Sequence, residues 1–299
     1  MVTRLPVTAR TDPAHGGRWT SLRTGGREWL WRRPNLDDDR DGDGARYRDG
    51  DREAVRPGDA FVDAGGLEEC IPTVRGTPDH GDAWSRPWHR LDDGTAVLEH
   101  PDFLLRRRIR HRPTALRAEY ELSAEPGYRF VWAAHALLDL GEQAVLSAPT
   151  GTATRLFPEA ADLLDRPWPT GARHLTGPWP SPHGLRLDRL GPDDGTAVGA
   201  ILTDCAHVTV TDGPDALSLS LHTDARVPVS VALWRNLRGF PAAEPYRSIG
   251  VEPMLGAVFD LAEAAPDDAA TVPAGGELRW ELVITATRAP SPPEGRSWS

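Results

Sequence analysis

The chain has 299 residues, with 44 acidic side chains against 34 basic ones, and its formal net charge is −10. Every basic side chain is an arginine, which excludes a lysine Schiff base and a Walker-type phosphate lysine, and the negative charge disfavours nucleic acid as a partner. A large β-sandwich or barrel of this length can form one unit. We predict a single domain over residues 1–299, with residues 286–299 as a disordered proline-rich tail.

The two cysteines, Cys70 and Cys205, are too few to cross-link a chain of this length, and neither belongs to a CxxC pair. Free thiols are typical of a reducing compartment. The first residues contain no apolar run of the kind found in signal peptides, and no segment has the apolar length needed to cross a bilayer. We therefore expect a cytoplasmic protein without membrane partners, whose oligomeric state the sequence does not indicate.

The elements predicted along the chain are almost all strands. Gly25 and Gly26 separate the runs 18–22 and 27–31, which predicts a hairpin because glycine tolerates the positive φ angles of a tight turn. Residues 116–122 and 278–284 alternate apolar and charged side chains with period two, the pattern of a half-buried strand. Further strands are predicted at 96–99, 103–110, 129–133, 197–202, 207–211, 217–222 and 227–234.

Helical signals are scarce. Residues 159–166 form the best candidate, a short helix that Pro167 would end. Many short strands separated by regular turns favour an all-β sandwich or barrel over an alternating α/β fold.

Residues 37–53 form an acidic, glycine-rich segment that partly matches a calcium-binding loop. Asp37, Asp39, Asp41 and Gly42 fit the opening of an EF-hand loop, but Arg48 occupies the twelfth position, where a bidentate glutamate is required. Arginines interleave with the carboxylates and neutralise them. We predict a solvated polar loop and no metal site.

Three stretches, 63–88, 131–138 and 249–256, combine glycine, proline, tryptophan and ionisable residues in a way that a core strand would not require. His135 lies in an apolar run, which fits either a satisfied core histidine or an acid–base group. Glu252 lies between apolar residues; burial would raise its pKa toward the range of a general base, whereas an exposed strand end is the alternative.

His80 lies in a turn-rich loop that also offers aspartate, arginine and two tryptophans. Such a set is typical of a polyol site, because charged groups bind hydroxyls and an indole face stacks on the C–H face of a pyranose. The alternative is a surface loop whose aromatic side chains pack locally. The sequence contains no GxSxG, HExxH, P-loop or GxGxxG arrangement.

The order of these stretches resembles the aldose 1-epimerase (galactose mutarotase-like) superfamily. Residues 16–31 resemble its opening hairpin, and residues 65–72 (GGLEECIP) are similar to its G-x-x-E-C-x-P segment. Residues 80–88 (HGDAWSRPW) match the spacing of H-G-F-A-R-x-x-x-W in the glucose-6-phosphate 1-epimerase branch, and residues 251–253 match its V-E-P motif. His135 falls where the family has its second histidine. The resemblance covers residues 16 to 286.

This resemblance implies a β-supersandwich of large antiparallel sheets and mutarotation of a sugar without a metal or nucleotide cofactor. In that reaction a glutamate takes the proton of the C1 hydroxyl while a histidine protonates the ring oxygen, so that the ring opens and recloses as the other anomer. Glu252 would be the base and His135 the acid, on opposite sides of the ring, with His80 holding hydroxyls or sharing the acid role. The side chains expected to bind the sugar are Glu69, Asp82, Trp84, Arg86, Trp88, Trp234 and Asn236.

One departure from the family pattern bears on the substrate. Trp84 stands where the phosphorylated-sugar branch has its arginine, so we expect an unphosphorylated monosaccharide. The main alternative is a non-catalytic carbohydrate-binding protein of the same fold, which would apply if His135 and Glu252 lie too far apart to act on one ring. A polysaccharide lyase fits less well because its uronate substrates need a cationic cleft, and a metal held by the acidic segment or the histidines is a further alternative.

Overall fold

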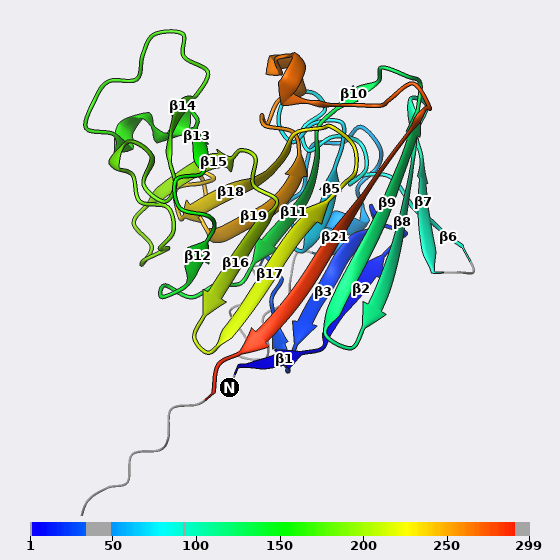
Figure 1. Ribbon diagram of the computed structural model, residues 1–299, viewed down its shortest axis with the longest axis horizontal. Helices are drawn as coiled ribbons and strands as arrows, with labels where there is room; N and C mark the ends of the chain where they lie inside the picture. Colours follow the sequence, from blue (N-terminus) through cyan, green and yellow to red (C-terminus); the bar gives the residue numbers. More distant parts are fainter. Residues whose placement is uncertain (1, 34–48, 92–93, 291–299) are drawn as a thin grey trace, which may run out of the picture.

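The computed structural model describes residues 2–33, 49–91 and 94–290 (Figure 1). These residues form two large antiparallel sheets, here called sheet A and sheet B, and a two-stranded pair of β10 (Arg129–Phe130) and β20 (Ala270–Thr271). Sheet A contains β1 (Thr3–Leu5), β6 (His89–Arg90), β7 (Thr95–Glu99), β8 (Phe103–Arg112), β9 (Ala115–Ala124), β12 (Val145–Ser147), β16 (His207–Asp212), β17 (Asp215–His222) and β21 (Glu277–Arg288). The predicted all-β supersandwich class is confirmed.

Sheet B supplies the strands that carry the candidate site. Its order is β14-β13-β15-β18-β19-β11-β5-β3-β2, with β4 paired to β3. Its members are β2 (Val7–Asp12), β3 (Arg18–Thr24), β4 (Arg27–Glu28), β5 (Leu67–Cys70), β11 (Trp132–Leu138), β13 (Ala153–Leu156), β14 (Leu175–Pro178), β15 (Thr196–Leu202), β18 (Val229–Leu237) and β19 (Arg247–Leu255).

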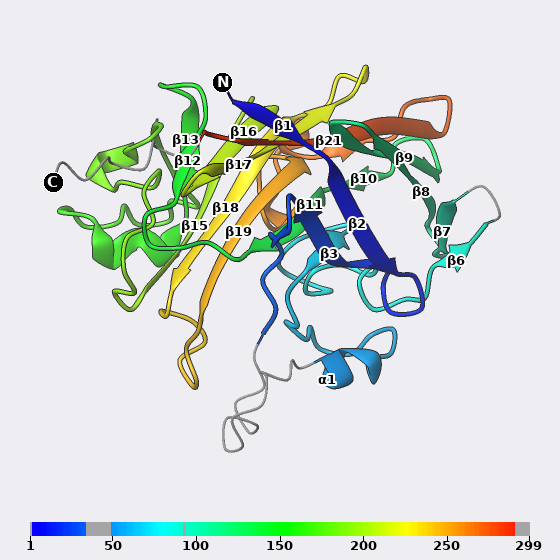
Figure 2. The ribbon, with the colours of Figure 1, turned by 90° about the horizontal axis from the view of Figure 1, so that it is seen from below.

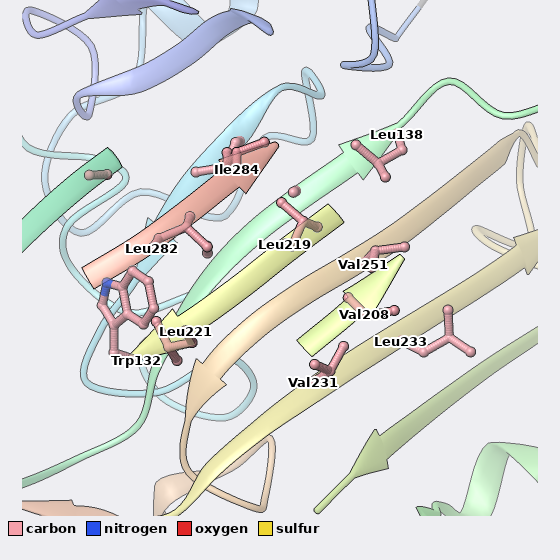
Figure 3. Close-up of a cluster of buried hydrophobic side chains, with 14 of the residues drawn as sticks. Trp132, Leu138, Val208, Leu219, Leu221, Val231, Leu233, Val251, Leu282 and Ile284 are labelled. Atoms are coloured by element: carbon pink, nitrogen blue, oxygen red, sulfur yellow. The ribbon is translucent and has the colours of Figure 1, made fainter. Parts of the chain in front are cut away.

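The main core lies between the two sheets, where apolar side chains from alternate positions of each strand meet (Figure 3). Trp132, Val251 and Leu233 come from sheet B, and Leu219 and Ile284 come from sheet A. Sheet B is also covered on part of its other face, because a smaller apolar cluster packs there against the loop that follows β19. Members of this second cluster are Cys70, Val131, Ala133, Ala232, Met254, Val258 and Phe259.

The predicted strands and the first hairpin are present, and they extend by a few residues at most ends. Gly25 and Gly26 have positive φ angles and join β3 to β4. The expected helix at 159–166 is instead a short 3-10 helix, η2 (Pro158–Leu163). The other short helices are α1 (Asp49–Glu53), η3 (Pro182–Gly184), η4 (Leu261–Glu263) and η5 (Pro266–Asp268), and no helix of the described ranges is long and apolar enough to span a membrane.

Two boundary predictions need correction or fall outside the described residues. The disordered tail was predicted to begin at residue 286, which is too early. Strand β21 continues to Arg288, where it pairs with both β1 and β17. Residues 291–299 lie outside the described residues, as does most of the acidic segment 37–53, whose last five residues form α1.

The three stretches singled out for their ionisable residues, 63–88, 131–138 and 249–256, contain core strands. Their central parts are β5, β11 and β19, which are neighbours in the middle of sheet B. The alternation of apolar and polar residues is weak in these strands because both of their faces are buried, and a strand covered on both faces has no regular polar side. Their adjacency brings residues that are far apart in the sequence onto one surface.

Candidate active site

Strand register places Glu252 and His135 side by side on the face of sheet B that points away from sheet A. In the pairing of β11 with β19, Ala133 is opposite Met254 and Leu137 is opposite Gly250, so His135 and Glu252 face each other between these pairs. The distance from His135 Nε2 to Glu252 Oε1 is 3.8 Å. The alternation of the pleat therefore positions a histidine and a carboxylate for joint chemistry.

Glu252 is almost completely buried, with an exposed fraction of 2%. Burial raises the pKa of its carboxyl group, and the charges of His135 and Arg75 lower it in part. No residue of the described chain donates a hydrogen bond to its Oε2 atom. A Cβ atom at Gly250 would clash with Oε1, so this glycine leaves the space in which the carboxylate lies. The exposed strand-end interpretation of Glu252 is wrong.

His80 reaches the same place from the loop that follows β5. Its ring meets the His135 ring edge-on at a centroid distance of 4.9 Å, and its Nδ1 atom lies 3.1 Å from Asp79 Oδ1. Partial burial raises the pKa of Asp79, but the hydrogen bond and charge of His80 outweigh it and hold that pKa below its ordinary value. The two histidines and Glu252 thus form one cluster, with a second carboxylate at its edge.

Phe61 forms the outer side of this cluster, and sequence reasoning did not identify it. Its ring stacks on His80 at a centroid distance of 3.5 Å with an interplanar angle of 8°, and it meets His135 edge-on at 6.0 Å. The segment that carries Phe61 is anchored by Arg52, whose Nε donates to Glu68 Oε1 at 2.8 Å and whose guanidinium lies over Trp84. No sequence motif marks this segment.

Arg75 is a further residue that the sequence reasoning did not single out. It lies on the same side of sheet B, and its charge acts on Glu252. Its guanidinium lies 4.2 Å from the Phe259 ring and 5.7 Å from the Trp234 ring, and its Nη2 donates to Glu159 Oε1 at 2.8 Å. One indication of its place near the site was present in the sequence: Arg75 follows the G-x-x-E-C-x-P-like stretch by three residues.

The separation of 3.8 Å changes the expected arrangement of acid and base. A pyranose ring does not fit between Glu252 and His135, so the two groups cannot lie on opposite sides of it. They can instead approach two neighbouring oxygens from one side. The hydroxyl and ring oxygen of a hemiacetal are both bonded to C1 and form such a pair.

Glu69 does not belong to the site, although we expected it to bind the sugar. As the neighbour of Glu68 along β5, it points to the opposite face and is fully buried between the sheets. Its Oε1 atom accepts hydrogen bonds from Arg107 at 2.5 Å, Tyr120 at 3.0 Å and Trp19 at 3.3 Å. The Glu69 carboxylate is thus part of the core. The prediction placed it on the wrong face of β5, because neighbouring residues of a strand point to opposite faces.

Trp84, Trp88 and Asn236 are also buried rather than available to a ligand. The two indoles have exposed fractions of 1% and 3%, so neither presents a face to solvent. Asn236 uses its amide within the β18–β19 connection, where its Oδ1 accepts hydrogen bonds from the backbone of Gly239 and Phe240. Their burial argues against direct contact of these three side chains with a sugar.

Asp82 and Arg86 are partly exposed and interact with each other. Arg86 Nη2 lies 3.5 Å from Asp82 Oδ1, and His100 Nε2 lies 3.5 Å from Asp82 Oδ2, so this part of the loop is turned toward the β7–β8 connection. Trp234 is the expected binding residue that lies beside Glu252: it is partly exposed and is the register partner of Gly250. In the ranges described, no group of three or more His, Cys, Asp or Glu side chains could hold a metal ion.

Similarity of this chain to known proteins is found among solved structures. No protein-family model and no curated protein matches the sequence. Among solved structures, the Slr1438 protein of Synechocystis has a TM-score of 0.65 at 14% identity, with 96% of each chain covered. An Escherichia coli K12 protein provisionally named an aldose 1-epimerase has a TM-score of 0.62 at 13% identity, covering 96% of this chain and 99% of that one.

A third similar structure is a galactose mutarotase-like protein from Lactobacillus casei, with a TM-score of 0.60 at 16% identity over 96% of this chain and 100% of that one. At these identities the likeness concerns the fold alone. The chain therefore has a galactose mutarotase-like fold, as the sequence motifs implied.

Proposed function

We propose that this protein is a mutarotase that interconverts the anomers of a free, unphosphorylated aldose. The observation that carries the proposal is the buried Glu252 carboxylate 3.8 Å from His135, with His80 against the same histidine. The fold shared with galactose mutarotase-like proteins supports it. The closeness of these two groups favours catalysis over the alternative of a non-catalytic sugar-binding protein.

The chemistry needs one base and one acid. Glu252 removes the proton from the C1 hydroxyl while His135 gives a proton to the ring oxygen, so the C1–O5 bond breaks and an open-chain aldehyde forms. Rotation about C1–C2 and the reverse proton transfers close the ring as the other anomer and restore both side chains. Burial favours this role for Glu252, since a carboxylate with a raised pKa is a stronger base.

The charges near the site favour a neutral sugar over a sugar phosphate. Arg75 is paired with Glu159, and Arg86 is close to Asp82. A phosphate group needs cations that are not already neutralised, as in bidentate arginine sites. An uncharged hexose instead needs hydroxyl partners and one apolar surface, which the histidines, Arg75 and the Phe61 and Trp234 rings would supply.

Polarimetry or NMR exchange measurements on a panel of aldoses test the proposal. We expect the wild-type protein to accelerate anomer exchange of at least one neutral aldose, and Glu252→Gln and His135→Asn each to reduce the rate by about 10²–10⁴-fold. Glu281→Gln is the matched control, because Glu281 pairs with Arg117 on sheet A. A wild-type rate equal to that of buffer over the whole panel would refute catalysis, and saturable binding of sugar without exchange would establish the sugar-binding alternative.

A further inference from the structure

The connection between β18 and β19 holds an aromatic side chain out in solvent. Phe240 is 53% exposed, and it is the aromatic member of the exposed large apolar side chains in the described residues, the others being Val2 and Leu91. Single exposed apolar side chains are common on protein surfaces, so Phe240 is a candidate contact only together with the residues around it.

The backbone around Phe240 is held in place by Asn236. The Oδ1 atom of this fully buried amide accepts from the backbone N–H groups of Gly239 and Phe240, both at 3.0 Å, and its Nδ2 donates to the Phe240 carbonyl at 2.8 Å. At the two ends of the connection, Arg238 and Arg247 both bind Asp193 at 2.8 Å. The exposure of Phe240 is therefore built into the structure, which is typical of a preorganised binding surface.

Phe240 is linked to the candidate active site through one residue. Trp234 pairs with Gly250 across β18 and β19. Because Gly250 has no side chain, Glu252 Oε1 and Trp234 Cβ both lie next to the space that its Cβ would occupy. On its other side, Trp234 meets Phe240 edge-on at a centroid distance of 5.9 Å. In Figure 2 the connection between β18 and β19 and the segment with α1 both project downward beyond sheet B. Glu252, Trp234 and Phe240 thus form a continuous line outward from the site.

The geometry points to a second sugar-binding subsite at Phe240, on the outer side of the Trp234 ring that borders the first sugar. This inference rests on the proposed function, and it names the substrate class as the reducing end of a disaccharide or longer saccharide. The added unit would be joined through a hydroxyl other than that of C1, because C1 must be free to react. Its C–H face would cover Phe240, and the exposed side chains of Arg238 and Asp193 at the base of the connection would bind its hydroxyls.

The test compares a monosaccharide with a disaccharide that has the same reducing-end sugar, for example glucose with cellobiose, maltose and lactose. We expect at least one disaccharide to show a higher kcat/KM than glucose, and Phe240→Ala to lower that value about three- to tenfold through KM while leaving the glucose value unchanged. Phe240→Trp should retain the preference. Leu91→Ala, at another exposed apolar side chain, is the control and should change neither substrate.

Binding of a methyl glycoside of the disaccharide, which cannot mutarotate, separates this inference from the proposed function. Binding that Phe240→Ala weakens, in the absence of any anomer exchange by the wild type, would support the subsite and refute the mutarotase. An equal loss for glucose and disaccharide in Phe240→Ala, or no preference for any disaccharide, would overturn the subsite. Self-association of the wild type that Phe240→Ala abolishes, measured by sedimentation, would also overturn it by showing that a second copy covers the ring.

Discussion

Among the buried glutamates of sheet B, Glu69 and Glu252 lie on opposite faces and have different surroundings. Glu69 faces sheet A, where Arg107, Tyr120 and Trp19 all donate to its Oε1 atom. Glu252 faces away from sheet A, its Oε2 atom has no donor among the described residues, and its contact with His135 is 3.8 Å long. Burial alone therefore does not identify a reactive carboxylate. The number of donors that hold it separates a structural glutamate from one able to accept a proton.

The largest effect on stability should come from breaking the Glu69 pair. Arg107→Met would leave the Glu69 carboxylate buried without its charged partner, and we expect the free energy of unfolding to fall by about 3–5 kcal/mol. Denaturant unfolding followed by tryptophan fluorescence measures this loss.

The double variant Glu69→Gln/Arg107→Met is the matched control. It removes both charges from the core and should lose less stability than Arg107→Met alone. If the single variant costs less than about 1 kcal/mol, Glu69 is not held as a charged group and the contrast with Glu252 fails.

Substitution of Glu252 should raise the free energy of unfolding, by less than Arg107→Met lowers it. Its carboxyl pKa is raised in the folded protein, so ionisation favours the unfolded chain once the pH exceeds the ordinary pKa of a glutamate. Glu252→Gln should therefore stabilise the protein at neutral pH by about 1 kcal/mol while it removes the proposed activity.

The pH dependence of this gain gives the control. Below the ordinary pKa of glutamate, the Glu252 carboxyl is protonated in both the folded and the unfolded wild type. The stabilisation by Glu252→Gln should therefore disappear as the pH falls below that pKa. Thermal unfolding at several pH values measures it. A variant that is less stable than the wild type at neutral pH would show that the Glu252 carboxylate stabilises the fold.

The smallest expected effect concerns Arg75. Its charge lowers the pKa of Glu252 in part, so Arg75→Gln should raise that pKa and move the acidic limb of the pH–rate profile to higher pH. Arg86→Gln is the comparison, since its guanidinium is close to Asp82 and does not act on Glu252. An unchanged acidic limb in Arg75→Gln would show that the limb reports another group.

Much of the fold was predictable because the long strands of sheet A are half-buried. Residues 116–122 and 278–284 alternate cleanly, and they became β9 and β21. The central strands β5 and β19 were not recognised as strands, and only the start of β11 fell within the strand predicted at 129–133. Burial on both faces removes the alternation on which such a prediction depends.

The candidate site was predictable only in part, because strand register and loop contacts are not visible in the sequence. His80, His135 and Glu252 were identified from motif order, and the structure places them together. Glu69 was assigned to the wrong face because that choice depends on register, which a single strand does not reveal. Phe61 contacts the site through a loop segment without any motif, so composition gave no signal for it.

The separate origin of Phe61 has a consequence for how such a site can vary. Glu252 and His135 are fixed by the pairing of two central strands, whereas the ring that lies on His80 arrives on a segment held by the Arg52–Glu68 pair. A change in that segment can turn or release His80 without disturbing strand register. Under the proposed function, the acid–base pair and a residue that contacts the ligand are thus held by separate segments, so a substitution can alter one without the other.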